Sequence, residues 1–194
     1  MPNIIRTTTT IGSYGAPEFH KSIAAASELA NYYNLPFYGT AGCSDAKTID
    51  PQSVAEVQME LFSTILSKAN LIHDVGVLDH CNSVAPAMVV LANEMIDQLS
   101  AYSKGVEVTE KTLAMDVIKG VGQGGHYLNE KHTLKNFRTI WYPEFFKRRM
   151  VNPDQSDVME MVNAKIDTIL TSHVVPALDP AILAEIEKIE KKYL

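Results

Sequence analysis

The sequence has little cysteine, no excess of basic residues and no long apolar run, and each absence excludes a class of protein. Cys43 and Cys81 are too few for a disulfide framework and form no CxxC pair. A formal net charge of −6 excludes the basic face that general nucleic-acid binding needs. No apolar run approaches the roughly 20 residues of a membrane span, and the first residues resemble no signal peptide. We therefore expect a cytoplasmic protein that binds neither nucleic acid nor membrane.

The remaining composition is that of an ordinary globular protein, with 46% hydrophobic and 21% charged residues among 194. The stretch 69–76 organises the chain, because its apolar run ends in His73, Asp74 and Gly76 between two helical patterns, 51–68 and 83–103. A strand between two helices is typical of a βαβ unit with a parallel sheet.

Further strands and helices follow from the same patterns. Residues 4–11 and 37–42 predict two more strands. Helices are predicted where apolar residues recur at helical spacing or a cap precedes proline, over 17–33, 51–68, 83–103, 109–119, 129–137, 141–149, 155–172 and from 180 onward. Three strands cannot close a barrel, which needs about eight. We therefore predict an α/β fold in one partial domain spanning 1–194, with βα units over 1–104 and a glycine-rich loop and helices over 105–194.

Two consecutive predicted strands each deliver a carboxylate at the carboxyl end, where parallel sheets collect their chemistry. These carboxylates are Asp45 and Asp74, and we expect both at the same rim. An alternative is that they cap the following helices or pair with Lys47. Strand alternation points His73 to the side opposite Asp74, which predicts a buried structural histidine.

Several stretches, in order, resemble the trimethylamine methyltransferase family, the corrinoid-dependent methyltransferases that include glycine betaine enzymes. The resemblance covers about residues 6–149. It is carried by Arg6-Thr7 and by the runs YGAPE at 14–18, YNLP at 33–36, GCSDAK at 42–47, DPQ at 50–52, ANLIHDVG at 69–76, GQGGHYL at 122–128 and HTL at 132–134.

This resemblance implies that the chain is the C-terminal part of a (β/α)8 TIM-like barrel, with parallel strands and extra C-terminal helices. Family members move a methyl group from a tri- or quaternary methylamine, such as trimethylamine or glycine betaine, to the cobalt of a separate corrinoid protein. No cofactor would be bound permanently, since the partner presents cob(I)alamin, and no metal site is expected. The chain has no non-standard residue, which favours the branch without pyrrolysine.

The resemblance also implies roles for particular residues. The expected catalytic residues are Asp45, Asp74 and His126, the last in a glycine loop over the barrel mouth. The other expected site residues are Tyr14, Tyr38, Lys47 and Tyr127 for the substrate and Gly124 and Gly125 for the corrinoid. The alternatives are that the loop is a tight turn, that Lys47 is an ion-pair partner and that the aromatic residues are core.

Two functions therefore remain open: a methyltransferase or a piece of one, and a non-catalytic half-barrel module that assembles with another chain. A βα-barrel aldolase is weakened because no lysine lies in a predicted strand. An incomplete barrel leaves apolar faces uncovered, so we also expect a large apolar surface. Its expected consequence is a homo-oligomer or an assembly with a missing N-terminal half.

Overall fold

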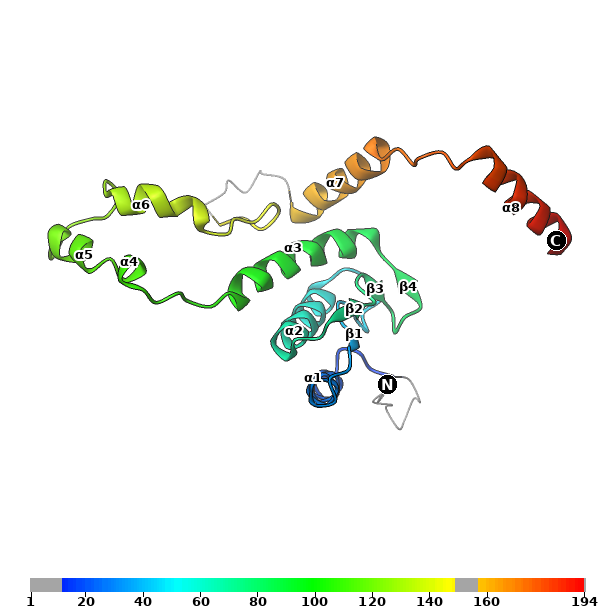
Figure 1. Cartoon of the computed structure of the whole chain (residues 1–194), viewed down its shortest axis with the longest axis horizontal. Helices are drawn as coiled ribbons and strands as arrows, with labels where there is room; N and C mark the ends of the chain where they lie inside the picture. Colours follow the sequence, from blue (N-terminus) through cyan, green and yellow to red (C-terminus); the bar gives the residue numbers. More distant parts are fainter. Residues whose placement is uncertain (1–11, 149–156, 194) are drawn as a thin grey trace.

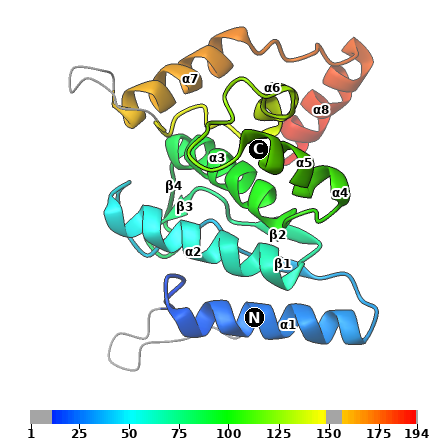
Figure 2. The ribbon, with the colours of Figure 1, turned by 90° about the vertical axis from the view of Figure 1, so that its left-hand side faces the viewer.

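The computed structural model describes residues 12–148 and 157–193. Figure 1 shows a body built from three long helices and four short strands, from which the C-terminal half extends as a series of separate helices. The long helices are α1 (Pro17–Tyr32), α2 (Pro51–Ser67) and α3 (Pro86–Ser103). In Figure 2 they lie one above another, and α2 packs against both of its neighbours.

The strands confirm the predicted parallel pairing and add a hairpin that we did not predict. β1 (Tyr38–Thr40) pairs in parallel with β2 (Leu71–His73). β3 (Val77–Leu78) and β4 (Ser83–Val84) then pair antiparallel. The predicted start of the third helix at Ser83 is therefore wrong: α3 begins at Pro86, whose fixed φ suits a first helical turn. The strand predicted over 4–11 lies outside the described residues.

The core lies between one face of the β1–β2 sheet and the long helices. Ile72 of β2 packs against a buried cluster to which α2 contributes Val57 and Leu61 and α3 contributes Met88, Leu91 and Met95. These are the stripes predicted from helical spacing. The same spacing fails at helix ends, where Leu29, Tyr33 and Tyr102 are exposed. The structure confirms an α/β chain, and the two parallel strands found among the described residues are fewer than a barrel requires.

The predicted start of α2 is confirmed. The Asp50 side chain accepts a hydrogen bond from Ser53 N at 2.9 Å, and the Ser53 hydroxyl receives one from Asp50 N, which completes a capping box. Asp179-Pro180 repeats this start at α8 (Pro180–Tyr193), where Asp179 Oδ1 accepts from Ala181 N. The two helices differ in burial: α2 has buried side chains in the core, whereas α8 has none.

We expect Asp50→Ala to lower the free energy of unfolding by about 1 kcal/mol, the usual loss for an N-cap. The measurement is urea unfolding followed by circular dichroism. Asp179→Ala is the matched control, and at a protein concentration low enough to keep the chain monomeric it should leave the midpoint unchanged, because α8 buries no side chain against the body. Equal losses in the two variants would contradict this account.

The C-terminal half departs more from the predicted helices. The helix expected over 109–119 is two, α4 (Glu110–Leu113) and α5 (Met115–Val121), because Ala114 adopts a left-handed conformation. α5 continues through Gly120, where an end was predicted. α6 (Lys131–Asn136) passes into a 3-10 turn at Phe137–Thr139. Residues 141–148 form no helix, contrary to prediction.

Of the helices described in this half, α7 (Val158–Ser172) is the one that packs closely against the body. It packs against α3 and buries Val162. Three of the others, α4, α5 and α6, bury no side chain, and the same is true of α8. The chain consequently exposes 14,328 Å², whereas a compact monomer of 21.4 kDa exposes about 9,100 Å². Many large apolar side chains are exposed, among them Ile118, Leu128 and Ile182, as the sequence predicts, and self-association stays a prediction.

Within 12–148 and 157–193, the structure holds no helix that is both long and apolar enough to cross a membrane.

Candidate functional site

One face of the β1–β2 sheet is turned away from the core helices and carries polar and aromatic side chains. Tyr38 and Thr40 share this face with Leu71 and His73, because side chains alternate along each strand and the strands are in register. Thr40 Oγ1 lies 3.1 Å from His73 Nε2. The rings of Tyr38 and His73 are 4.4 Å apart between centroids. Tyr38 is 57% exposed and Leu71 66%, whereas Thr40 is only 2% exposed, so the face is open to a ligand at Tyr38 and Leu71.

Asp74 ends β2 and stands beside the histidine that precedes it. Its Oδ2 atom lies 2.8 Å from His73 Nδ1, and both side chains are only partly exposed. The prediction that His73 is buried and points away from Asp74 is wrong. Asp74 has a φ of +73°, so the chain leaves the extended conformation at this residue and strand alternation no longer applies. The two side chains therefore form a pair, which Thr40 extends.

Asp45 follows β1 and is used to hold another loop. Its carboxylate accepts hydrogen bonds from Tyr14 N at 2.8 Å and Gly15 N at 3.2 Å, and from the Ser13 hydroxyl. His80 Nδ1 lies 3.0 Å from Asp45 Oδ1. Asp45 is 11% exposed, so its oxygens are committed to these partners.

The alternatives considered for these charges are also resolved. Asp45 fixes the turn before α1 and does not cap α2, whose cap is Asp50. Lys47 Nζ lies 4.0 Å from Asp79 Oδ1 and does not pair with Asp45. Lys47 is therefore the ion-pair partner of another residue at this edge, as its alternative interpretation suggested.

The loops that follow the two strands are joined by backbone hydrogen bonds, and together we call them the rim, residues 41–46 and 74–79. The bonds run from Gly76 N to Gly42 O at 2.9 Å, from Ser44 N to Val77 O at 3.0 Å and from Asp79 N to Ala46 O at 2.9 Å. The parallel pairing thus continues beyond the strands. It confirms the prediction that Asp45 and Asp74 lie at the same rim.

The backbone around the rim is strained. Gly42 and Gly76 have φ of +85° and +91°, which glycine adopts without steric cost. Asp74, Asp79, His80 and Cys81 are also left-handed, at +51° to +73°. Such conformations cost free energy in residues with a side chain and cluster at functional sites. This strain supports a functional role for the rim.

Tyr14 lies where the loops meet. A hydrogen bond with Cys81, together with burial and nearby negative charge that includes Asp74, raises the pKa of its hydroxyl. The tyrosine therefore stays neutral at ordinary pH and can act only as a hydrogen-bonding group. Burial, reinforced by Glu60, likewise raises the pKa of Cys43. The thiol stays protonated, which makes it a poor nucleophile.

Two acids of α2 hold the rim from behind, and sequence reasoning missed both. Glu60 is 1% exposed and its Oε2 accepts from Cys43 N at 2.9 Å. Burial raises the pKa of Glu60 to about 8. Glu56 Oε2 accepts from Asp45 N at 2.9 Å and from the Ser44 hydroxyl. The sequence did contain a sign of this role. Glu60 lies beside Val57 and Leu61 on the apolar stripe of the helix, where a charged side chain exposed to water is not expected.

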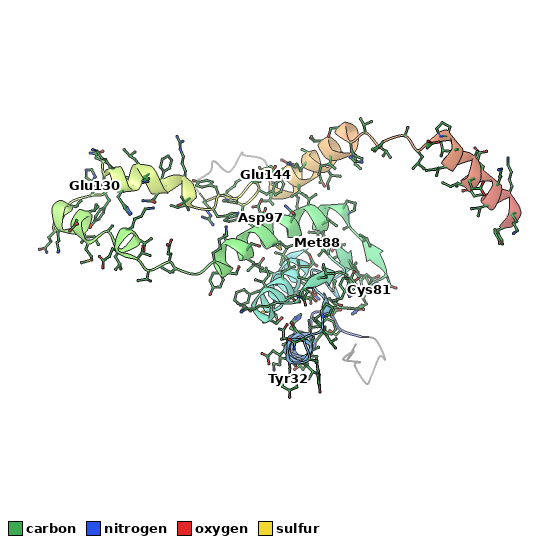
Figure 3. All side chains as sticks on the ribbon, viewed as in Figure 1. Tyr32, Cys81, Met88, Asp97, Glu130 and Glu144 are labelled. Atoms are coloured by element: carbon green, nitrogen blue, oxygen red, sulfur yellow. The ribbon has the colours of Figure 1, made fainter. Side chains whose placement is uncertain are left out.

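The structure does not bring the glycine-rich loop to the rim. His126 and Tyr127 are exposed between α5 and α6, with Gly124 at φ +79°. Figures 1 and 3 show α5, α6 and Glu130 on the side of the molecule opposite Cys81 and β4. A Cβ on Gly125 would collide with Val121, so packing within the loop explains why a glycine stands at this position. The expected position of His126 over a barrel mouth is therefore not seen.

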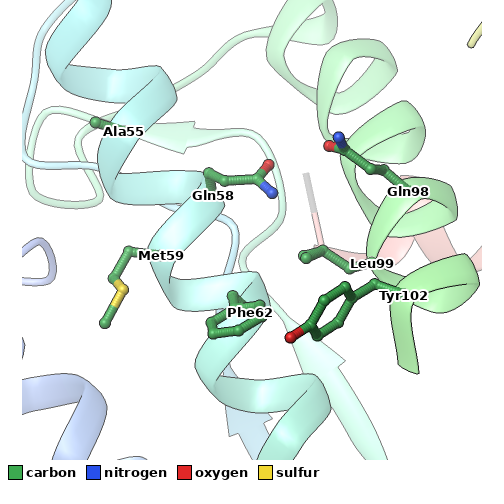
Figure 4. Close-up of a pocket in the computed structure, with 7 residues that line it drawn as sticks. All are labelled: Ala55, Gln58, Met59, Phe62, Gln98, Leu99 and Tyr102. Atoms are coloured by element: carbon green, nitrogen blue, oxygen red, sulfur yellow. The ribbon is translucent and has the colours of Figure 1, made fainter. Parts of the chain in front are cut away.

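Two hollows of the described surface lie away from the rim. One, of about 470 Å³, is an apolar groove between α2 and α3, shown in Figure 4. A second, of about 510 Å³, lies between the end of α3 and residues 138–141. Throughout the described part of the chain, no three His, Cys, Asp or Glu side chains are grouped to hold a metal ion.

Comparison with known proteins shows which protein family this chain resembles. The family described as trimethylamine methyltransferase (MTTB) matches residues 9–193. The glycine betaine methyltransferase of Desulfitobacterium hafniense strain Y51 is 32% identical over 90% of this chain and 38% of its own length. A trimethylamine methyltransferase of D. hafniense strain DCB-2 is 38% identical over 70% and 27%. That of Methanosarcina barkeri strain Fusaro is 30% identical over 92% and 37%.

The chain spans less than two fifths of the length of these relatives. The family match nevertheless runs through nearly all of its 194 residues, including both strands, the rim and the C-terminal helices. This chain belongs to the trimethylamine methyltransferase family.

Proposed function

We propose that this chain supplies part of the methyl-donor site of a methyltransferase. The methyl group moves from a tri- or quaternary methylamine, such as trimethylamine or glycine betaine, to the cobalt of a corrinoid protein. The observation that carries the proposal is the group formed by Tyr38, His73 and Asp74 on the open sheet face. His73 and Asp74 stand at the carboxyl end of β2, where such folds collect their chemistry, and the Tyr38 ring at the start of β1 reaches His73.

The chemistry of this group suits a methylated cation. The face of the Tyr38 ring attracts a quaternary ammonium, and the Asp74 carboxylate, 30% exposed, supplies an opposite charge. Demethylating a quaternary amine releases a neutral tertiary amine, so no proton has to be delivered to the leaving group. The protein has to hold and orient the cation. His73 fixes the direction of Asp74 and is itself fixed by Thr40.

Asp45 has an indirect role in this proposal and does not contact the substrate. Its oxygens hold the turn of residues 13–15, and this turn brings Tyr14 toward Cys81 and the rim. Asp45 is therefore a positioning residue, and Asp74 is the carboxylate left to meet the substrate.

The open face also suits a corrinoid that a partner protein presents. Tyr38 and Leu71 are both well exposed there, so a flat macrocycle can approach the bound cation from outside the chain. When bound, cob(I)alamin supplies the nucleophile, and the residues of this chain hold the methyl donor. The glycine loop of residues 122–126 is a second exposed surface for the corrinoid partner, since nothing lies within 4 Å of a Cβ placed at Gly122 or Gly124.

The second candidate function is an interaction module without activity of its own. The 14,328 Å² of exposed surface favours it, because so open a chain is suited to assembly. The two functions differ in whether the rim chemistry is used, and a methyl-transfer assay separates them.

The test measures methyl transfer to cob(I)alamin with a panel of methylamines. It is run on this chain alone and on the chain mixed with the portion of the D. hafniense glycine betaine methyltransferase that it does not match. We expect Asp74→Asn to lower the rate about tenfold or more through loss of the charge that holds the cation. Asp79→Asn, at the same rim but paired with Lys47, is the matched control. Equal rates in wild type and Asp74→Asn would refute the role of Asp74.

A further inference from the structure

The last helix, α8, presents an apolar face that nothing in the described chain covers. Ile182, Ile186 and Ile189 recur at helical spacing, with Leu183 and Tyr193 beside them, and these side chains are 39–76% exposed. A helix of 14 residues is marginal in water when it packs on nothing. The segment 173–179 that precedes it has no regular structure, and Val174 and Val175 are exposed within it. α8 therefore needs a partner surface.

A matching surface lies in the groove between α2 and α3, which we call the outer groove. α2 is apolar on two opposite sides: Val57 and Leu61 face the core, while Met59 and Phe62 line the groove. On the other wall stands Tyr102, its ring 5.7 Å from that of Phe62. Figure 4 shows Phe62 and Tyr102 turned toward one another, with Met59 on the side of α2 away from α3.

The outer groove lies on the side of α2 that the sheet does not use. Strands pack against the opposite side of this helix, so further strands extending the β1–β2 sheet would not cover the groove. Every residue that lines it is uncharged, which suits an apolar helix. The groove and the apolar face of α8 therefore form a matched pair on one chain.

The same chain cannot readily fill its own groove. In Figure 1, α7 runs opposite to α3 and leads away from the groove, with α8 beyond it. Seven residues, 173–179, span at most about 25 Å, while returning along α3 from Pro86 to Leu99 alone takes about 20 Å. Entry from that end would also set α8 parallel to α2 and α3, with like ends of the helix dipoles together.

We infer that α8 is an exchanged arm, which packs into the outer groove of a second copy of this chain while that copy returns its own α8. In the second copy the arm can run antiparallel to α2 and α3. Glu185 in its first half and Glu187 at its middle then lie near Lys68 and Lys104, which end those two helices. The helix dipoles favour the same direction.

The available area is sufficient for a specific dimer. The exposed apolar side chains of α8 amount to on the order of 500 Å² per arm, so two arms and two grooves reach the roughly 1,600 Å² of a standard interface. The exchange is reciprocal and closes on itself, as two-fold symmetric dimers do. It is independent of methyl transfer, because neither α8 nor the groove contacts the rim.

The experiment is sedimentation equilibrium of the full chain. We expect a dimer, and we expect Ile186→Asp in the arm and Met59→Asp in the groove each to raise its dissociation constant about tenfold or more. Both positions are exposed in the single chain, so neither change removes a core contact. Lys191→Asp, on the polar side of α8, is the matched control and should leave the dissociation constant unchanged.

Mixing the two variants gives the decisive measurement. The Ile186→Asp chain still has an unchanged outer groove, and the Met59→Asp chain still has an unchanged α8. In a mixed dimer, the unchanged α8 can therefore pack into the unchanged groove. We expect the mixture to associate more tightly than either variant alone. A monomeric wild type, a dimer insensitive to both substitutions, or a mixture no tighter than its components would overturn the inference. So would a monomer whose hydrodynamic radius grows with Met59→Asp, since that would place α8 in its own groove.

Discussion

Replacing Glu94 with alanine is expected to lower the free energy of unfolding by about 4 kcal/mol. Glu94 is 4% exposed on α3, and its two oxygens accept from Phe145 N at 2.6 Å and Phe146 N at 2.7 Å. Hydrogen bonds to a charged group are the strong ones, and alanine would leave both amides without their acceptor. Phe145, which belongs to the core, would lose its anchor. Urea unfolding measures the change.

Glu144→Ala is the control for this measurement. It removes an acid of the same segment that pairs with Lys165 at 2.9 Å, on the surface. Surface pairs of this kind contribute at most about 1 kcal/mol. Glu94→Gln should fall between the two, because it keeps an acceptor oxygen for one of the two amides. Equal losses for Glu94→Ala and Glu144→Ala would contradict the role given to Glu94.

Glu60→Gln is expected to change how stability depends on pH. Burial raises the pKa of Glu60 to about 8 in the folded chain, from 4.5 for an unperturbed glutamate. The folded state therefore holds a proton that the unfolded state releases between these values. The stability contributed by the protonated carboxyl is fully present below pH 4.5 and is lost as the pH rises to about 8. Across that window the loss is up to about 4 kcal/mol.

The comparison is urea unfolding of the wild type and of Glu60→Gln at pH 5 and at pH 8.5. Glutamine imitates the protonated carboxyl, so the variant should gain on the wild type by about 3 kcal/mol or more between the two conditions. Every other titrating group is common to both proteins, and their difference isolates Glu60. Two stability curves that stay parallel across this range would show that Glu60 is already charged in the fold.

Local chemistry made the body of this fold predictable. The Asp-Pro pairs at residues 50–51 and 179–180 start helices because a cap and a fixed φ act within one turn. The two apolar runs before the rim predicted adjacent parallel strands, and with them the common rim of Asp45 and Asp74. These inferences needed only neighbours in sequence and the directionality of parallel sheets.

The misses have both local and distant causes. The β3–β4 hairpin has two residues in each strand, too few to show a period. The pairing of His73 with Asp74 follows from the left-handed conformation of Asp74, which the presence of an aspartate in the sequence does not predict. Glu60 and Glu94 are buried because backbone amides 17 and about 50 residues away supply hydrogen bonds. The distance of His126 from the rim likewise depends on how whole segments are arranged.

The backbone bonds between the two rim loops have a mechanical consequence. Ser44, Gly76 and Asp79 each donate to the opposite loop, so neither loop can open without breaking the bonds of both. Loops joined in this way behave as a single cooperative unit of local unfolding. The separation between Asp45 and Asp74 is thus set by backbone hydrogen bonds between the two loops, and it does not depend on the partners of either side chain.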